Sequence, residues 1–493
     1  MKCGELTKLL ITARWFYESD VVITGMTNDS RKVVPGDLFV CLHGYRVDGH
    51  QFVQEAIEHG AVAIVTEKLL DITIPQLLVN DSVRAMAMIA TYYYDYPLEK
   101  LSLIGVTGTN GKTTTTYLLE RLLEFAEKRT GVIGTIEMRY ADKKFPMLQT
   151  TPHSLELQHF FANMRDEQID YCVMEVSSHA LEQGRVLGCS FRTAIFTNLT
   201  QDHLDYHQTM SRYEAAKGLI FSRLGNRFYR DEQQRSYAVL NADDQVAKRY
   251  AASTAVEVVT YGIENKADVR ATNIQISHHG SRFMLHSFRG SCLIELPLAG
   301  KFNIYNALAA ITAALLENIS LETIRDALAD LCGVPGRVEK VESNQKFSVY
   351  IDYAHTPDGL QNVLYAVREI TDGKLITVFG CGGERDRSKR PLMGKIAATL
   401  SDHVIVTSDN PRSEDPALIM KEIEQGIESL QLLHKQHQLI SDRREAIKKA
   451  IEMAGPSDVV LIAGKGHETY QLIDGVSHPF DDRIVAKEAI RGL

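Results

Sequence analysis

One short turn constrains the fold of this chain more than any other feature. Between a strand-like apolar run at residues 101–106 and a leucine-rich stretch of helical spacing lies Gly108-Thr109-Asn110-Gly111-Lys112-Thr113-Thr114. Glycine lets backbone N–H groups approach an oxyanion, and the start of the following helix adds positive potential. In such a turn Lys112 can reach the β- and γ-phosphates, and the Thr113 hydroxyl can bind Mg2+. The turn therefore predicts an ATP site in an α/β domain.

The turn departs from a strict Walker A motif at one position. That motif has glycine five positions before Gly111, where this chain has Val106. A glycine-rich turn that only caps a helix is the alternative interpretation. The Gly-Lys-Thr-Thr run at a strand-to-helix junction favours the phosphate loop.

Acidic and histidine side chains follow two further strand-like runs. Glu175 comes directly after residues 171–174. Asp202 and His203 come shortly after residues 194–197. Doubly wound sheets bind ligands at the carboxyl ends of their strands, so these side chains are candidates for holding a divalent cation. His203 taken alone favours a structural role, because Mg2+ prefers oxygen ligands.

Hydrophobic periodicity divides the 493 residues into three parts, as expected at about 150 residues per domain. In the first part, a helical stretch at residues 51–59 lies among strand-like runs at residues 37–42, 61–66 and 76–79. Beyond a tyrosine cluster that ends in Pro97, strand-like and helical runs alternate, which predicts a mainly parallel sheet. A turn at residues 333–336 ends that part, and a second doubly wound pattern follows. We therefore expect an α/β fold of three domains: a small α/β domain at residues 1–97, a central P-loop-type ATPase domain at 98–334 and a C-terminal Rossmann-like domain at 335–493.

Charge and cysteine usage exclude several classes of partner and location. Asp and Glu number 63 against 54 Lys and Arg, giving a formal net charge of -9, so no nucleic-acid partner is expected. The seven cysteines are scattered without a Cys-x-x-Cys pair, which favours a reducing compartment. Glu5, Lys8 and Arg14 interrupt the N-terminal apolar positions, and the apolar stretch at residues 306–316 is too short to cross a bilayer. We expect a cytoplasmic protein without a membrane span.

Three polar motifs follow strand-like runs in the third part of the chain: Gly382-Gly383-Glu384-Arg385, Asp409-Asn410-Pro411-Arg412 and Gly464-Lys465-Gly466-His467-Glu468. Their shared position at strand ends predicts one converging pocket. Arg385 and Arg412 could meet the carboxylates of a zwitterion, and Glu468 or Asp409 its ammonium group. Surface ion pairs at helix starts are the alternative interpretation.

Four motifs together give the chain a specific resemblance. They are the turn at residues 108–114, Met-Glu-Val-Ser-Ser-His at 174–179, Asn-Leu-Thr-Gln-Asp-His-Leu-Asp-Tyr-His at 198–207 and Asp-Tyr-Ala-His-Thr-Pro at 352–357. In these motifs the chain resembles the Mur ligases, over nearly its whole length from residues 29–31 to 464–468. The resemblance implies a cytoplasmic, ATP-dependent enzyme of peptidoglycan stem-peptide synthesis. Within the family, the chain is most similar to the enzymes that add the third residue.

The resemblance also implies a set of metal ligands. Thr113 and Glu175 would hold one Mg2+, and His203 would help to hold a second. Lys217 matches the lysine that such enzymes carbamylate with CO2, and the resulting anion would steady Mg2+ or an ordered water. From the residues alone, Lys217 is one of many lysines expected on a helix surface.

Nucleotide and substrate contacts follow from the same resemblance. Asn303 and Asn306 match contacts of the nucleotide, while Arg337 and Asp352 match residues that reach the γ-phosphate and ribose. Ser30 matches a contact of the uridine portion, although its hydroxyl could instead bond its own backbone in the turn. The contacts on the muramoyl-dipeptide end correspond to Thr150, Thr151, Ser177, Gln183 and Arg185.

The implied reaction joins meso-diaminopimelate to UDP-MurNAc-L-Ala-D-Glu through an acyl phosphate, with Lys112, Lys217 and Arg337 as catalytic residues. Arg412 favours diaminopimelate over lysine because diaminopimelate carries a second carboxylate. A lysine-adding ligase, a folylpolyglutamate synthetase-like ligase and a nucleotide-binding regulatory protein are the alternatives. A monomer is expected.

Overall fold

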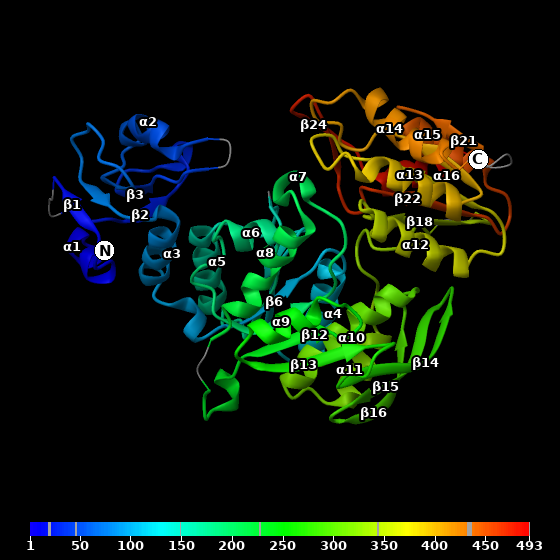
Figure 1. The fold of residues 1–493 in the computed structure, drawn as a ribbon, viewed down its shortest axis with the longest axis horizontal. Coiled ribbons are helices and arrows are strands. Elements are labelled where there is room, and N and C mark those ends of the chain that lie inside the picture. The colour runs from blue at the N-terminus through cyan, green and yellow to red at the C-terminus, as the bar shows by residue number, and fades with distance from the viewer. Residues whose placement is uncertain are drawn as a thin grey trace. The chain divides into compact units, whose positions relative to one another are not determined.

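The computed structural model describes residues 1–17, 21–44, 47–147, 149–225, 228–342, 345–430 and 436–492 (Figure 1). Its contacts divide the chain into two compact units. The first unit contains residues 1–104 and 129–192, and the second contains residues 105–128 and 193–493. Two strands, β6 (Ser102–Thr107) and β11 (Phe191–Phe196), begin in the first unit and end in the second.

The first unit begins with a five-stranded sheet in the order β1-β5-β4-β3-β2. Its strands are β1 (Arg14–Phe16), β2 (Gly25–Thr27), β3 (Asp37–Val40), β4 (Ala63–Thr66) and β5 (Gln76–Leu78). All neighbouring strands are parallel except β1, which is antiparallel to β5. One face packs against α1 (Cys3–Leu9) and α3 (Ser82–Tyr93), and the other against α2 (Val53–Glu58). The predicted strands at 37–42, 61–66 and 76–79 are confirmed, each with a shorter span.

The rest of the first unit continues with β7 (Thr130–Ile133), β8 (Met138–Tyr140), β9 (Lys143–Phe145) and β10 (Tyr171–Glu175). Strand β10 runs parallel to β7, whereas β7, β8 and β9 pair antiparallel. Helix α5 (Ser154–Asp166) lies beside α3 (Figure 1), and Leu155 at its start joins the core under α3. Helix α6 (Ser178–Glu182) follows β10 directly, with the Ser177 hydroxyl capping its N-terminus.

The central part of the second unit is a mixed sheet. Strands β11, β12 (Tyr237–Asn241), β13 (Glu257–Gly262) and β14 (Val269–Ser277) are parallel, and β15 (Gly280–Ser287) and β16 (Gly290–Leu296) add antiparallel hairpins. Its helices are α4 (Lys112–Phe125), α7 (Leu204–His207), α8 (Met210–Ser222), α9 (Ala247–Ser253), α10 (Lys301–Leu316) and α11 (Leu321–Ala329). The apolar stretch at 306–316 belongs to α10, which packs against α4, β12 and β13. Among the described residues, no helix has the length and apolar character that a membrane span requires.

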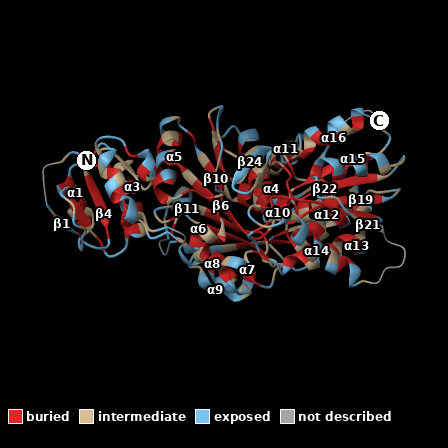
Figure 2. Cartoon of the chain, turned by 90° about the horizontal axis from the view of Figure 1, so that it is seen from above, coloured by how far each residue is buried: buried red, intermediate tan, exposed pale blue. Residues whose placement is uncertain are grey.

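The C-terminal part of the second unit is doubly wound, as predicted. Its sheet has the order β17-β18-β22-β19-β20-β21. The strands are β17 (Glu339–Lys340), β18 (Ser348–Asp352), β19 (Leu375–Phe379), β20 (His403–Val406), β21 (Gln436–Leu439) and β22 (Val459–Ala463), all parallel except β17. Helices α12 (Pro357–Glu369), α13 (Lys389–Leu400) and α14 (Pro416–Glu428) cover one face, and α15 (Arg443–Met453) and α16 (Asp482–Arg491) the other. A hairpin of β23 (Tyr470–Ile473) and β24 (Val476–Pro479) follows β22, and Figure 2 shows β19 and β22 buried between the helical layers.

Candidate functional site

The predicted phosphate loop joins β6 to α4, and its glycines are required by geometry. Gly108 and Gly111 have φ angles of +149° and +86°. A Cβ on Gly108 would lie 1.8 Å from Thr197 Oγ1, and one on Gly111 would lie 2.2 Å from Asn306 Oδ1. Lys112 Nζ donates to the carbonyl oxygens of Gly108 and Thr109, at 2.9 and 2.8 Å. The carbonyl oxygens of the loop therefore bind the side chain of Lys112, the first residue of α4.

Asn198 shapes this loop from the neighbouring segment. Its carbonyl oxygen accepts from Thr109 N at 2.9 Å, and its Oδ1 accepts from Asn110 N at 3.0 Å. The Thr109 hydroxyl in turn donates to Thr200 O at 3.1 Å. Asn198 lies within the 198–207 motif, but nothing about the residue itself distinguished it as a scaffold for the loop.

Lys217, on α8, contacts the same loop carbonyl as Lys112. Its Nζ donates to Gly108 O at 2.7 Å and lies 4.5 Å from the centre of the Tyr213 ring. The side chain is buried, with 1% of the residue exposed, so the expectation of a helix-surface lysine was wrong. Burial, reinforced by the positive charge of Lys112, holds the pKa of this amine well below its usual value. Its spacing from Tyr213 and Phe221 on α8 was the available signal, because residues four apart share a helix face.

Asp202 is a buried carboxylate at the centre of a polar cluster. Its carboxylate accepts from His203 N at 2.9 Å and lies 3.2 Å from His203 Nε2. Lys389 Nζ lies 3.8 Å from the same carboxylate, and His355 Nε2 lies 3.9 Å from it. Although burial opposes it, the charges of His203 and Lys389 hold the pKa of Asp202 well below its usual value. Burial and the nearby Lys389 lower the pKa of His355 to about 4.

His203 therefore pairs with a buried acid, and it is also the left-handed residue, with φ of +55°, that precedes α7. The contact with Asp202 gives His203 a structural role, as the sequence predicted for His203 taken alone. Lys389 is the first residue of α13. Its place in this cluster was not predicted, because no sequence motif distinguishes it from other lysines.

The residues matched to nucleotide contacts lie in the second unit. Arg337 Nη2 donates to Thr113 Oγ1 at 3.0 Å, and the guanidinium lies 4.6 Å from the centre of the Tyr353 ring. Asp352 accepts from the backbone of Val338 and Ala354, at 2.8 and 2.7 Å. Burial raises the pKa of Asp352, against the opposing charge of Arg337. These contacts fasten the turn after β18 and hold Arg337 on the first turn of α4.

Two asparagines of α10 line the same loop. Asn306 Nδ2 lies 3.4 Å from Asn303 Oδ1, and Asn303 Nδ2 donates to Ala299 O at 2.8 Å. Asn306 also limits the space at Gly111. Thr114, one residue beyond Thr113 on α4, is buried.

The residues matched to the muramoyl-dipeptide end form one network in the first unit, together with Glu175. The buried Glu175 carboxylate accepts from Thr135 N and from Thr135 Oγ1, both at 2.9 Å. Thr135 Oγ1 lies 3.2 Å from Thr150 Oγ1. Thr151 Oγ1 donates to Glu175 O at 2.8 Å and accepts from Ser177 N at 3.1 Å. The predicted residues are thus neighbours although they come from separate parts of the chain.

Arg185 completes this network. Its Nε donates to Gln183 Oε1 at 2.9 Å, and its Nη1 donates to Thr151 O at 3.1 Å. A third bond joins Arg185 to the side chain of Gln149. These bonds hold a guanidinium beside the two threonines.

Ser30 lies in the first unit, in a short 3-10 helix at Ser30–Lys32 that Asp29 caps. Its hydroxyl donates to Glu55 Oε2 at 2.6 Å, and its carbonyl oxygen lies 2.8 Å from His59 Nδ1. The alternative in which the hydroxyl bonds its own backbone is therefore wrong.

The three polar motifs of the third part do lie together. Strands β22, β19 and β20 are neighbours in the sheet and run parallel, so the loops after them leave the same edge. Asn410 Nδ2 donates to Glu468 Oε2 at 2.9 Å, and Asn410 Oδ1 accepts from Lys465 Nζ at 3.1 Å. Lys465 is fully buried and forms an ion pair with Glu468 at 2.9 Å. Burial raises the pKa of Glu468, against the opposing charge of Lys465. Lys465 was not predicted as a functional residue although it lies inside the motif at residues 464–468.

Arg412 has a strained backbone conformation and places a cation at this sheet edge. Its φ is +55°, and its Nη1 donates to Gly383 O at 2.6 Å. Burial and the neighbouring charge of Arg385 lower the pKa of Arg412. Within the described ranges no carboxylate lies within ion-pair distance of the Arg385 or Arg412 guanidinium. The ion pairs near the start of α13 instead join Arg387 to Glu422 and Arg390 to Glu414.

Close packing holds these loops together. A Cβ on Gly383 would lie 1.9 Å from Pro411 O, and one on Gly464 would lie 2.6 Å from Asp409 Oδ2. The arrangement places two arginines, the buried Lys465 and two acids at one sheet edge, which suits a ligand that carries both charges.

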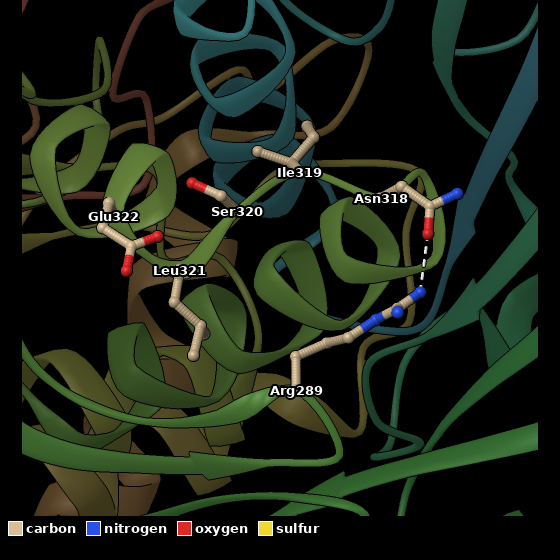
Figure 3. Close-up of a pocket in the computed structure, with 6 residues that line it drawn as sticks. All are labelled: Arg289, Asn318, Ile319, Ser320, Leu321 and Glu322. Atoms are coloured by element: carbon tan, nitrogen blue, oxygen red, sulfur yellow. Dashed lines mark hydrogen bonds between the residues drawn. The ribbon is translucent and has the colours of Figure 1, made fainter.

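A surface pocket of about 250 Å3 lies elsewhere in the second unit (Figure 3). Its lining comes from the β15–β16 turn and the start of α11: Arg289, Asn318, Ile319, Ser320, Leu321 and Glu322. Arg289 donates to Asn318 Oδ1 at 2.6 Å. No predicted site residue lines this pocket.

Family models match most of the chain in three consecutive segments. The Mur ligase family, catalytic domain, matches residues 22–93; the Mur ligase middle domain matches 106–314; and the Mur ligase, glutamate ligase domain, matches 336–466. The chain belongs to the Mur ligase family. The resemblance in the sequence motifs and the predicted α/β fold are thereby confirmed.

Relatives within the family match the chain along nearly all its length. A protein of Geobacillus kaustophilus is 51% identical over 469 residues, which is 95% of either chain. A protein of Bacillus cereus is 49% identical over 470 residues, which is 95% of this chain and 94% of that one. Both are named UDP-N-acetylmuramoyl-L-alanyl-D-glutamate--2,6-diaminopimelate ligase.

Solved structures agree with this membership. A structure with the same ligase name matches with a TM-score of 0.69 and 35% identity, over 100% of this chain and 99% of that one. A Mycobacterium tuberculosis folylpolyglutamate synthase complexed with ADP and AMPPCP matches with a TM-score of 0.64 and 18% identity. It covers 77% of this chain and 92% of its own, and at that identity it shares the fold alone.

Proposed function

We propose that this chain is an ATP-dependent ligase that joins meso-diaminopimelate to the D-glutamyl side-chain carboxylate of UDP-MurNAc-L-Ala-D-Glu, a step of peptidoglycan precursor synthesis. The observation that carries this proposal is the full-length identity of about half with two ligases of that name. The arrangement of cations and acids at the β22-β19-β20 edge supports the same amino-acid substrate. We expect the enzyme to act in the cytoplasm and as a monomer.

The domain boundaries predicted from the sequence assign each substrate to one part of the chain. Residues 1–97, with Ser30, would bind the uridine portion, and residues 98–334 would bind ATP. Residues 335–493 would bind the incoming amino acid. The family-model segments at 22–93, 106–314 and 336–466 support this division.

The residues that the resemblance matches to metal ligands are of types that fit Mg2+. Thr113 would supply a hydroxyl and Glu175 a carboxylate to one ion, while His203 would assist a second. When bound, Mg2+ would neutralise charge on the phosphates. Lys217 fits carbamylation because its buried amine loses its proton more readily than an exposed lysine, and a neutral amine is the form that reacts with CO2. That reaction forms an N–C bond and releases one proton, leaving a carbamate anion.

The protein's part in the chemistry is to position anions and offset their charge. ATP transfers its γ-phosphoryl group to the D-glutamyl carboxylate, giving an acyl phosphate and ADP. The amine of diaminopimelate attacks the acyl carbon, and the tetrahedral intermediate expels phosphate. Lys112 and Arg337 would oppose the repulsion between the approaching anions. Both are held in the loop region, by Gly108 O and Thr113 Oγ1.

Arg412 supports diaminopimelate over lysine as the third residue. Its guanidinium is half-buried and bonds only a backbone carbonyl among the described residues, so it can take the second carboxylate of diaminopimelate. Lysine would leave that cation without a counter-charge. Arg385, exposed at the same edge, would take the other carboxylate.

Two alternatives make different predictions. A folylpolyglutamate-type ligase does not need the first domain, so removing residues 1–97 would spare its activity and would abolish the proposed one. A regulatory nucleotide-binding protein would hydrolyse ATP without an amine. The test is phosphate release with ATP, Mg2+ and UDP-MurNAc-L-Ala-D-Glu, comparing diaminopimelate, lysine and no amine. Release that depends on diaminopimelate supports the proposal, and release indifferent to the amine contradicts it.

A further inference from the structure

A cluster of metal-ligating side chains lies in the first unit and includes none of the residues assigned to the proposed ligase site. His43, Asp48 and His50 each offer a ligand atom, and these atoms all lie within 4.8 Å of one another. His50 Nδ1 lies 2.6 Å from Asp48 Oδ1, and His43 Nδ1 lies 3.4 Å from the same oxygen. Two ligand atoms of one metal ion lie at most about 4.4 Å apart, since each metal–ligand bond is about 2.0–2.2 Å long. The separations in this cluster are close to that limit or below it.

Backbone contacts fix the positions of the residues that carry this cluster. The segment after β3 folds back so that His43 and Asp48 form an isolated antiparallel bridge. Gly49 N donates to Leu42 O at 2.8 Å, and a Cβ on Gly49 would lie 2.9 Å from Leu42 N. The His50 side chain is 2% exposed, whereas that of His43 is 53% exposed. The cluster thus has a fixed, buried base and an open side that solvent ions can reach.

The charges around the cluster favour a divalent cation. Asp48 supplies a carboxylate, whose Oδ1 accepts from His50 N at 3.0 Å. Glu67, which follows β4, places Oε2 3.8 Å from His43 Nε2. Lys68 Nζ lies 3.6 Å from Asp48 Oδ2, but its side chain is 55% exposed and has room to move away. Two imidazoles and two carboxylates form a mixed nitrogen and oxygen donor set.

That donor set selects the class of metal. Imidazole nitrogen suits Zn2+, Ni2+ and Cu2+, whereas Mg2+ takes oxygen ligands in octahedral geometry. We propose that His43, Asp48 and His50 bind one divalent transition-metal ion of the Zn2+ type, with Glu67 in reach as a fourth ligand. The ion joins the segment after β3 to the segment after β4, and it is separate from the Mg2+ of the proposed ligase reaction.

The test is Zn2+ binding by the full chain, freed of metal and titrated by calorimetry in excess Mg2+. Unchanged protein should bind one equivalent of Zn2+. His43→Ala should weaken that binding at least about tenfold, as should Asp48→Asn. Because His43 is exposed, its variant is expected to fold, which circular dichroism checks. The matched control is His279→Ala, which changes an exposed histidine that pairs with His278 at a ring separation of 4.0 Å on the β14–β15 turn.

A second measurement reports coordination directly. Co2+ substituted into a site of imidazole and carboxylate ligands gives visible absorption bands, which should appear in the unchanged chain and be lost in His43→Ala. Retention of the bands and of tight Zn2+ binding in His43→Ala would overturn the proposal. So would equal loss in His279→Ala, or the absence of a stoichiometric Zn2+ site in the unchanged chain. Ligase activity does not enter either readout.

Discussion

Replacing Arg412 by alanine should separate amino-acid recognition from ATP use. The side chain is half-buried, its pKa is lowered by burial and by Arg385, and its Nη1 already donates to Gly383 O. Among the described residues, the Arg412 guanidinium has a backbone carbonyl but no carboxylate as its partner. A ligand carboxylate that binds this guanidinium forms a charge-assisted hydrogen bond with it. Alanine removes that partner and leaves the carboxylate facing a cavity.

The size of the effect follows from the burial. Hydrogen bonds to charged groups contribute about 1.5–3 kcal/mol, and truncating one partner of a fully buried pair costs about 2–5 kcal/mol. For a half-buried side chain we take about 2–3 kcal/mol. At about 1.4 kcal/mol per factor of ten, kcat/KM for diaminopimelate should fall about 30- to 140-fold. The KM for ATP should stay unchanged, because Arg412 lies in the loop after β20 and not on the phosphate loop.

The assay is coupled phosphate release with diaminopimelate, lysine and ATP varied in turn. The control is Arg289→Ala, which removes a guanidinium that bonds Asn318 in the separate surface pocket (Figure 3). The variant should also lose its preference for diaminopimelate over lysine. Equal losses for diaminopimelate and ATP, or an unchanged preference between the two amino acids, would refute the reasoning.

Four further outcomes follow. Gly108→Ala should abolish nucleotide binding in a fluorescent-nucleotide titration, because its Cβ would lie 1.8 Å from a threonine hydroxyl; normal binding would contradict this. Depleting CO2 should lower activity and bicarbonate should restore it, whereas Lys217→Ala should be inactive and insensitive to bicarbonate. Asp482→Ala should lower the free energy of unfolding by about 3–5 kcal/mol in urea, because it strands the fully buried Arg443, whose Nη2 lies 2.7 Å from Asp482 Oδ2. The free energy of unfolding should fall as pH drops from 6.5 toward 4, since His355 has its pKa lowered to about 4 and the unfolded chain takes up that proton first; stability that is flat across this interval would contradict a His355 that stays neutral in the folded chain.

The strands and the loop chemistry could be predicted because their signals are local. An apolar run such as residues 375–379 forms a buried parallel strand wherever helices cover both faces, and it does so here. The glycines of the phosphate loop are likewise required by the positive φ angles of the loop itself, whereas the close approaches of Thr197 and Asn306 come from segments distant in sequence. The convergence of the three polar motifs could be predicted because parallel strands end at a common edge.

The partners of buried charges could not be predicted in this way. Lys389 and Lys465 are buried because segments distant in sequence fold over them, and neither lysine carries a local sign of that. Lys217 had a local sign in its spacing from Tyr213 and Phe221, but its partner Gly108 is distant in sequence. Lys389 meets Asp202 from a different part of the chain, and Lys465 meets Asn410 from a neighbouring loop. The antiparallel β14–β16 hairpins were also not foreseen, since the alternation of strands and helices elsewhere favoured a mainly parallel sheet.

The central claim is that ATP activates the acid of a sugar nucleotide so that diaminopimelate can be joined to it. The most direct measurement uses UDP-MurNAc-L-Ala-D-Glu labelled with 18O in the D-glutamyl side-chain carboxylate, with the products read by mass spectrometry. The account predicts a UDP-MurNAc-tripeptide that retains one labelled oxygen, formed together with phosphate that carries the other. Phosphate without label, released with no new peptide bond, would contradict it.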